Sequence, residues 1–294
     1  MSEPIFTGVA TALVTPFING KIDYDSFSKH INRQIESGID ALVVCGTTGE
    51  SPTLNDEEHK AAIEFVVKEV AGRVPVIAGT GSNDTAYSVQ LTNHACDAGV
   101  DACLLITPYY NKTTQAGLIA SFNAIADAST RPIILYNVPS RTGVNIAPET
   151  YADLVKHPLI NGIKEANGNI SSVVKTSSLI GDDAYIYSGN DDQITPIISL
   201  GGKGVISVLS NIAPKAALEI AHLALSGDFK TSAKLQAEYV DLCDALFSEV
   251  NPIPVKYAMS VLGFCENSLR LPLVQMSTDK AEVLKTCMKK HGLI

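Results

Sequence analysis

Residues 74–107 read VPVIAGTGSNDTAYSVQLTNHACDAGVDACLLIT. Two short apolar runs, Val74–Ala78 and Ala102–Thr107, flank the longer amphipathic stretch Thr85–Ala98. The short runs have the length and β-branched content of buried strands, whereas the stretch between them has the apolar spacing of a helix. A Gly-rich turn separates the first run from the helix. This part of the chain therefore predicts a strand–helix–strand unit of a parallel sheet.

The same alternation recurs along most of the chain. Strands are predicted at Gly8–Thr15, Ala41–Cys45, Val74–Ala78, Ala102–Thr107, Ile133–Tyr136, Ile160–Lys164, Ala184–Ser188 and Gly204–Ser207. Helices are predicted at Tyr24–Ser37, Asp56–Ala71, Thr85–Ala98, Gln115–Ala128, Pro148–Val155, Ser171–Leu179, Gln193–Leu200 and Pro214–Leu225. About eight strand-then-helix units predict an α/β fold, the (β/α)8 TIM barrel. An open doubly wound sheet is the alternative, but no G-x-G-x-x-G turn follows an early strand.

The pattern changes after Gly227. Asp228–Val250, Ile253–Leu262 and Thr278–His291 have helical spacing, and no strand is predicted between them. We therefore expect a catalytic barrel at residues 1–225 and a helical region at residues 226–294 that caps it.

The composition excludes several classes of partner. The chain has 294 residues, a formal net charge of −9 and a pI near 5.1, which argue against nucleic acid and anionic membranes. The N-terminus lacks a basic region followed by an apolar stretch, so no secretory signal is expected. The six cysteines form no C-x-x-C pair and suit free thiols in a reducing cytoplasm. The histidines have no metal-ligand spacing, so no metal is expected.

Lys164 ends the apolar segment Leu159–Lys164. A lysine at the inner end of a buried strand is desolvated, and desolvation disfavours its charged form. A neutral amine is what Schiff-base chemistry on a ketone requires. On the segment alone, a solvated lysine that merely ends a strand is the commoner explanation.

Other polar residues follow the predicted strands, where a barrel carries its active site. The turn Gly46–Ser51 (GTTGES) offers hydroxyls and exposed N–H groups that suit a carboxylate. Taken singly, each signal has an ordinary explanation: a plain turn, a packed tyrosine ring, or an Arg141 that pairs with a surface carboxylate.

The four segments GTTGES (46–51), PYYNK (108–112), YNVPSRTG (136–143) and GIKEANGN (162–169) are far more specific together. In this order and spacing they resemble the dihydrodipicolinate synthase family, within the pyruvate-dependent class I aldolases that include N-acetylneuraminate lyase. The resemblance extends from Phe6 to at least Leu225. It implies condensation of pyruvate with L-aspartate 4-semialdehyde through a lysine Schiff base, in the diaminopimelate route to lysine.

The resemblance also implies roles for individual residues. The catalytic group is Lys164 with the relay of Thr47, Tyr136 and Tyr110, the last from a neighbouring subunit. Substrate-binding positions are Thr48, Arg141, Gly189 and Ile206. No cofactor and no metal are implied, because the protonated imine is the electron sink. The implied assembly is a homotetramer, a dimer of dimers.

Lysine-inhibited relatives bind lysine in a cleft between subunits. The positions that match this effector cleft are Ser51, His59, Asn83 and Tyr109. Two matching positions depart from the pattern: Tyr87 stands where a carboxylate pairs with the ligand amine, and Asp56 stands where histidine is frequent. We therefore expect weak or absent inhibition by lysine.

Two other functions stay open at this point. One is a different pyruvate aldolase, acting on a sialic acid or a 2-keto-3-deoxy sugar acid, from which Arg141 distinguishes the chain. The other is a barrel that binds a keto acid as a sensor without turnover. The complete set of Thr47, Tyr136, Tyr110 and Lys164 argues against a sensor.

Overall fold

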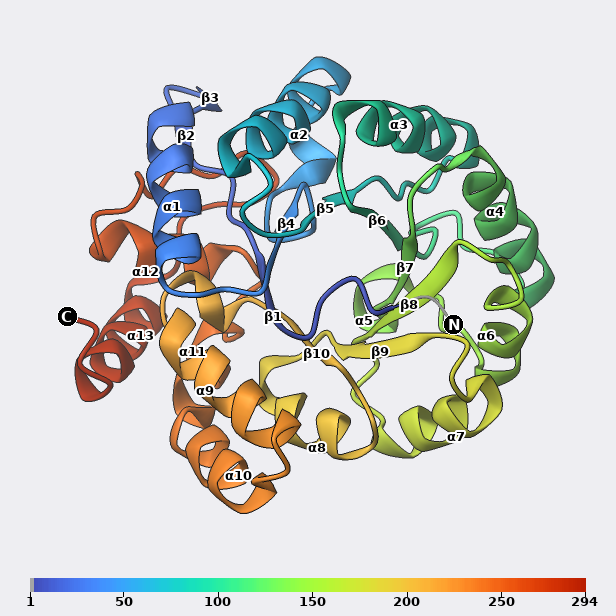
Figure 1. The fold of residues 1–294 in the computed structure, drawn as a ribbon. Helices are drawn as coiled ribbons and strands as arrows, with labels where there is room; N and C mark the ends of the chain where they lie inside the picture. Colours follow the sequence, from blue (N-terminus) through green and yellow to red (C-terminus); the bar gives the residue numbers. More distant parts are fainter. Residues whose placement is uncertain (1–2) are drawn as a thin grey trace.

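Eight parallel strands form a closed barrel in a computed structural model that describes residues 3–294 (Figure 1). The strands are β1 (Gly8–Ala12), β4 (Ala41–Val44), β5 (Val76–Gly79), β6 (Ala102–Ile106), β7 (Ile133–Asn137), β8 (Ile160–Glu165), β9 (Tyr185–Ser188) and β10 (Gly204–Ser207). The barrel closes where β1 pairs with both β4 and β10. The predicted (β/α)8 fold is therefore confirmed.

Among the strands, β1 differs most from its predicted end: it was expected to reach Thr15, but it ends at Ala12. Beyond Leu13, whose N–H still donates to a carbonyl of β4, the chain bonds to side chains and turns in place of a neighbouring strand. The N–H of Val14 donates to Asn211 Oδ1 at 3.2 Å, and the Thr15 hydroxyl donates to the carbonyl of Gly49 at 2.7 Å. Polar side chains thus replace the ladder at the end of the strand.

Helices surround the strands on the outside of the barrel (Figure 1). They are α1 (Tyr24–Glu36), α2 (Asp56–Val70), α3 (Thr85–Ala98), α4 (Gln115–Ala128), α6 (Pro148–Leu154), α7 (Ile170–Ile180), α8 (Ile194–Ser199) and α9 (Pro214–Leu225). Helix α2 begins with a capping box: the Asn55 side chain accepts from the N–H of Glu58, and the Glu58 carboxylate accepts from the N–H of Asn55.

Buried side chains fill two layers. The larger layer packs between the strands and the helices. A smaller cluster fills the barrel interior and includes Ala10, Val43, Ile77, Leu104 and Ile134. Because the interior is packed, only the ends of the strands leave room for a ligand.

The C-terminal part is helical as predicted, but the single helix expected at Asp228–Val250 is wrong. It is divided into α10 (Phe229–Glu238) and α11 (Val240–Leu246), which meet at Tyr239. The division lets α10 pack on α9 while α11 packs on α13 (Thr278–Lys290). Between α11 and α13 lies α12 (Ile253–Val261).

Several short elements were not predicted. They are the hairpin β2 (Phe17–Ile18) and β3 (Lys21–Ile22), the one-turn helix α5 (Pro139–Thr142), and the 3-10 turns η1 (Ser51–Thr53), η2 (Asp191–Gln193) and η3 (Leu209–Asn211). Elements of two to four residues are too short to show a period in the sequence. Most of them lie in loops that follow strands, beside the site.

Candidate active site

A cavity of about 690 Å³ opens at the carboxyl ends of the strands. Its lining contains most of the residues expected to be catalytic or to bind substrate: Thr47, Thr48, Tyr136, Arg141, Lys164 and Gly189. Residues 247–251 of the C-terminal region line it as well. Ile206 and Tyr110 are not among the lining residues. Ile206 is 1% exposed and packs in the interior cluster beside the cavity.

Lys164 lies on β8 and is 6% exposed. The register of β7 and β8 places it opposite Tyr136, and its Nζ lies 4.1 Å from the centroid of the Tyr136 ring. Burial lowers the pKa of Lys164 to about 7; Asp191 partly opposes the shift, and Arg141 adds to it. A large fraction of this amine is therefore neutral at neutral pH.

Tyr136 and Thr47 form the start of a hydroxyl chain beside the lysine. Burial raises the pKa of Tyr136, while the positive charge of Arg141 and a hydrogen bond with Thr47 oppose the rise. Thr47 belongs to the GTTGES turn, and its carbonyl accepts from the N–H of Glu50 at 3.1 Å. The turn thus fixes the backbone from which the Thr47 hydroxyl reaches the tyrosine.

Asn251 connects two predicted substrate-binding residues and was missed by the sequence analysis. Its amide Nδ2 donates to Thr48 Oγ1 at 3.0 Å, and its carbonyl accepts from the Arg141 guanidinium at 3.2 Å. It lies more than 100 positions from Arg141 along the chain. No local motif marks such a contact, because only the fold brings the C-terminal region to the barrel mouth.

Asp191 is a buried carboxyl group that acts electrostatically on Lys164. Asp191 Oδ2 accepts from the N–H groups of Val208 and Leu209, both at 2.9 Å, and burial raises its pKa. The Asp191 side chain therefore binds the start of η3, after the next strand, because the loops of a barrel converge in space.

Glu165 points away from the cavity, since successive side chains of a strand alternate. Burial raises its pKa to about 7. Its carboxylate accepts from Asn137 at 3.0 Å, from the Tyr151 hydroxyl at 3.0 Å and from the N–H of Asn167 at 2.9 Å. These contacts fix the strand end that carries Lys164.

A second cavity of about 310 Å³ adjoins the first. Three of the four expected effector residues, Ser51, His59 and Tyr109, line it, together with Tyr87. Asn83 is not among the lining residues. The two cavities share the residues Gly46, Thr47, Leu104, Tyr136 and Arg141. The two cavities therefore have part of their walls in common.

Tyr110 is the predicted catalytic residue that lies apart from the others. It is 91% exposed and has a positive φ of 69°, which a residue with a side chain rarely adopts. Its loop is held in place from both sides, since Asn111 donates to the carbonyls of Tyr109 at 2.9 Å and Asn83 at 2.8 Å. The phenol is thus presented outward from the chain that carries it.

Residues 3–294 contain no group of three or more His, Cys, Asp or Glu side chains arranged to hold a metal ion. No helix in this range combines the length and apolar character needed to cross a bilayer.

Comparison with known proteins identifies the family. Residues 5–291 match the model of the dihydrodipicolinate synthetase family. The 4-hydroxy-tetrahydrodipicolinate synthase of Thermoanaerobacter sp. (strain X514) is 50% identical over 292 residues, 99% of this chain and 98% of the relative. The crystal structure of dihydrodipicolinate synthase from Aquifex aeolicus has a TM-score of 0.97 at 44% identity, covering 98% and 99% of the two chains. A structure of the enzyme from Cyanidioschyzon merolae with lysine bound has a TM-score of 0.96 at 38% identity, covering 99% and 100%. The chain with Lys164 at its barrel mouth belongs to the dihydrodipicolinate synthetase family.

Proposed function

We propose that this chain is a 4-hydroxy-tetrahydrodipicolinate synthase that condenses pyruvate with L-aspartate 4-semialdehyde at Lys164. The observation that carries the proposal is the Lys164 amine, buried at the end of β8, 4.1 Å from the centroid of the Tyr136 ring. Because its pKa is lowered to about 7, much of the amine is neutral at neutral pH, and imine formation requires this neutral nucleophile. The enzyme is a lyase of the class I aldolase type.

The reaction follows from this amine. Lys164 adds to the ketone carbon of pyruvate, and water leaves to give a protonated imine. Loss of a proton from the pyruvate methyl gives an enamine, which attacks the aldehyde carbon of the second substrate, and the aldehyde oxygen becomes a hydroxyl. The amino group of that substrate then attacks the imine carbon, expels Lys164 and closes the ring. Each step is easier than forming a free carbanion of pyruvate.

The proton transfers fall to the relay of Thr47, Tyr136 and Tyr110. An unperturbed tyrosine has a pKa near 10, so a phenol transfers protons at neutral pH when neighbouring groups stabilise its anion. Thr47 and Arg141 supply that stabilisation to Tyr136. Thr48, Gly189 and the carbonyl of Ile206 complete the pyruvate side of the site in this proposal.

Arg141 selects the second substrate. It lines the same cavity as Lys164, and its guanidinium is oriented by the carbonyl of Asn251. A planar guanidinium binds a carboxylate through two hydrogen bonds, which suits the carboxylate of the semialdehyde. A sialic acid or a 2-keto-3-deoxy sugar acid would instead require groups that bind hydroxyls. This contrast favours the synthase over the other pyruvate aldolases.

Arg141→Ala is expected to raise KM for the semialdehyde strongly while changing KM for pyruvate little. Removing one partner of a desolvated charge pair costs about 2–4 kcal/mol of transition-state stabilisation. Steady-state kinetics with each substrate varied in turn measure both constants. Arg73→Ala, an exposed arginine after α2, is the control. An equal rise of KM for pyruvate, with no rise for the semialdehyde, contradicts the assignment.

We further propose a homotetramer built as a dimer of dimers, in which Tyr110 completes the relay of a neighbour. The exposed phenol on an ordered loop supports this proposal. In the same proposal residues 1–225 form the catalytic barrel, residues 226–294 cap it, and the enzyme works in the cytoplasm.

Mixing two inactive variants tests the shared site. Tyr110→Phe chains lack the donated phenol, and Lys164→Ala chains lack the amine. A mixed dimer contains one site with both groups, so activity is expected to return after subunit exchange. The exchange itself is followed with differently tagged chains. Exchange without recovered activity contradicts a shared site.

Inhibition by lysine is expected to be weak. Tyr87 has no charge to pair with a ligand amine, and Asp56 already binds Lys60 at 2.7 Å. Losing a charged partner for a buried ammonium costs about 1.5–3 kcal/mol, or about tenfold to a hundredfold in affinity. Tyr87→Glu should therefore increase the sensitivity. Half-inhibition of the unaltered enzyme below ~1 mM, a concentration that corresponds to roughly −4 kcal/mol, contradicts the expectation.

A further inference from the structure

A fully buried ion pair joins the GTTGES turn to the C-terminal region. The Glu50 carboxylate contacts Lys256 Nζ, and both side chains have 0% exposure. Glu50 belongs to the turn that carries Thr47 and Thr48, and Lys256 belongs to α12. The Lys256 ammonium also lies 4.1 Å from the centroid of the Phe17 ring. The two charges are thus removed from water and paired with each other across more than 200 positions of sequence.

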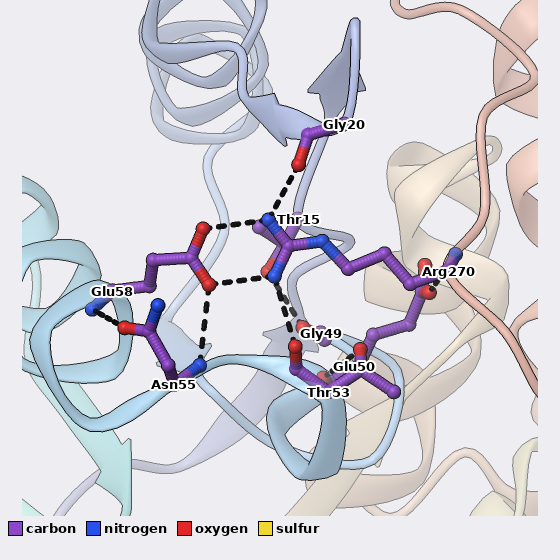
Figure 2. Close-up of polar contacts among 8 residues, drawn as sticks. All are labelled: Thr15, Gly20, Gly49, Glu50, Thr53, Asn55, Glu58 and Arg270. Atoms are coloured by element: carbon purple, nitrogen blue, oxygen red, sulfur yellow. Dashed lines mark hydrogen bonds and ion pairs between the residues drawn. The ribbon is translucent and has the colours of Figure 1, made fainter.

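Arg270 forms hydrogen bonds with the same turn and with the elements beside it (Figure 2). Its backbone N–H donates to the second oxygen of Glu50 at 3.1 Å. Its guanidinium donates to both carboxylate oxygens of Glu58 at 2.6 Å and to the carbonyls of Thr53 at 2.9 Å and Gly20 at 2.7 Å. A single side chain therefore ties the turn, its following helix α2 and the β2–β3 hairpin to the C-terminal region.

The backbone of Glu50 closes the turn in a strained conformation. Its φ of 54° and ψ of 34° place it in the left-handed region, which costs a residue with a side chain about 1–2 kcal/mol. In that conformation its N–H reaches the carbonyl of Thr47 at 3.1 Å. The preceding Gly49 carbonyl accepts the Thr15 hydroxyl at 2.7 Å. Strain of this kind persists where surrounding contacts over-determine it.

A buried ion pair is a poor device for stability, because the cost of removing two charges from water offsets their attraction. Apolar residues of similar size often stabilise a protein as well or better. The Glu50–Lys256 pair instead holds the turn in one position relative to α12. From this turn Thr47 reaches Tyr136.

We propose that Glu50, Lys256 and Arg270 are positioning residues that hold the GTTGES turn in register with Lys164, so that the C-terminal region is part of the catalytic apparatus. The proposal rests on the function proposed above. None of the three side chains lines the catalytic cavity. Their effect on the reaction therefore passes through Thr47, which acts in the relay, and Thr48, which holds the pyruvate carboxylate.

The test uses the full-length double variant Glu50→Met/Lys256→Met, which removes the tie and leaves no unpaired buried charge. Its thermal midpoint is expected to stay close to that of the unaltered enzyme. Its kcat is expected to fall about 10- to 100-fold, the loss typical of misplaced catalytic groups. KM for pyruvate should rise more than KM for the semialdehyde, because Thr48 lies in the loosened turn whereas Arg141 lies on α5.

Two further variants keep the test decisive. Arg270→Met leaves the Glu50–Lys256 pair intact and should lower kcat by about three- to tenfold, with the same rise in KM for pyruvate. It carries the test if the double variant does not fold. Lys156→Met removes an exposed pair, Lys156–Asp153, and should leave all constants unchanged.

Unchanged kcat and unchanged KM for pyruvate in folded double and Arg270 variants overturn the positioning role. So does an equal rise of both KM values, because that result indicates a general loosening of the mouth. Failure of the proposed function itself has a different signature: the unaltered enzyme then shows no condensation of pyruvate with the semialdehyde.

Discussion

Lys164→Arg is expected to abolish condensation, with kcat lower by on the order of 10⁴-fold or more, as for removal of other covalent nucleophiles. The guanidinium stays protonated at any pH the enzyme tolerates, so it cannot form an imine. The position tolerates the change poorly for a second reason, since the residue is 6% exposed and its charge would be uncompensated apart from Asp191. A coupled assay of product formation, with circular dichroism to confirm folding, measures the loss.

Lys203→Arg is a matched control, because Lys203 also lies over a tyrosine ring, 5.7 Å from the centroid of Tyr185, but outside the cavity. It should retain activity. The pH profile adds a check on the same amine. Because the Lys164 pKa is lowered to about 7 and only the neutral form attacks, kcat/KM for pyruvate should rise with pH through a midpoint near 7. Activity of Lys164→Arg within about tenfold of the unaltered enzyme contradicts the covalent role.

Tyr136→Phe is expected to lower kcat by about 10²–10⁴-fold, the usual contribution of a positioned acid–base group. The phenyl ring keeps its packing in the barrel interior and its place 4.1 Å from the amine. What is lost is the hydroxyl that binds Thr47 and that exchanges protons with substrate in the proposed mechanism. Pyruvate should therefore still bind, and KM for pyruvate should change far less than kcat.

Tyr187→Phe is the matched control for this variant. Tyr187 also lies in the barrel interior, opposite Lys164 on β9, but its hydroxyl donates to the carbonyl of Phe6 at 3.0 Å. Its loss should cost about 1 kcal/mol of unfolding free energy and leave kcat within about threefold. Equal kcat losses in the two variants would indicate that packing, not the Tyr136 hydroxyl, supports turnover.

The barrel could be predicted because its signal is local and repeated. Each strand is a short β-branched run, each helix has its own apolar spacing, and Asn55 marks the start of α2 by a cap that needs only the next three residues. The helix expected at Asp228–Val250 failed for the opposite reason. Its apolar spacing continues through Tyr239, and only packing on two different neighbours separates α10 from α11.

The residues of the candidate site likewise fall into those that the sequence predicts and those that it does not. Lys164 and Tyr136 lie at strand ends. Thr47 and Arg141 lie shortly after strands, within short motifs, and the barrel brings all four to one cavity. Asn251 and Lys256 carry no such signal. Asn251 reaches Thr48 and Lys256 reaches Glu50 only because the C-terminal region folds back onto the barrel mouth. Contacts between distant segments depend on the tertiary fold and leave no period or spacing in the sequence.

The central claim is that Lys164 forms a covalent imine with pyruvate, and borohydride reduction tests it most directly. The unaltered enzyme is incubated with pyruvate, reduced, digested and mapped by mass spectrometry. The account predicts loss of activity together with a reduced pyruvyl adduct on the peptide that contains Lys164, and no adduct when pyruvate is omitted. An adduct on a different lysine, or an active enzyme that forms none, contradicts it.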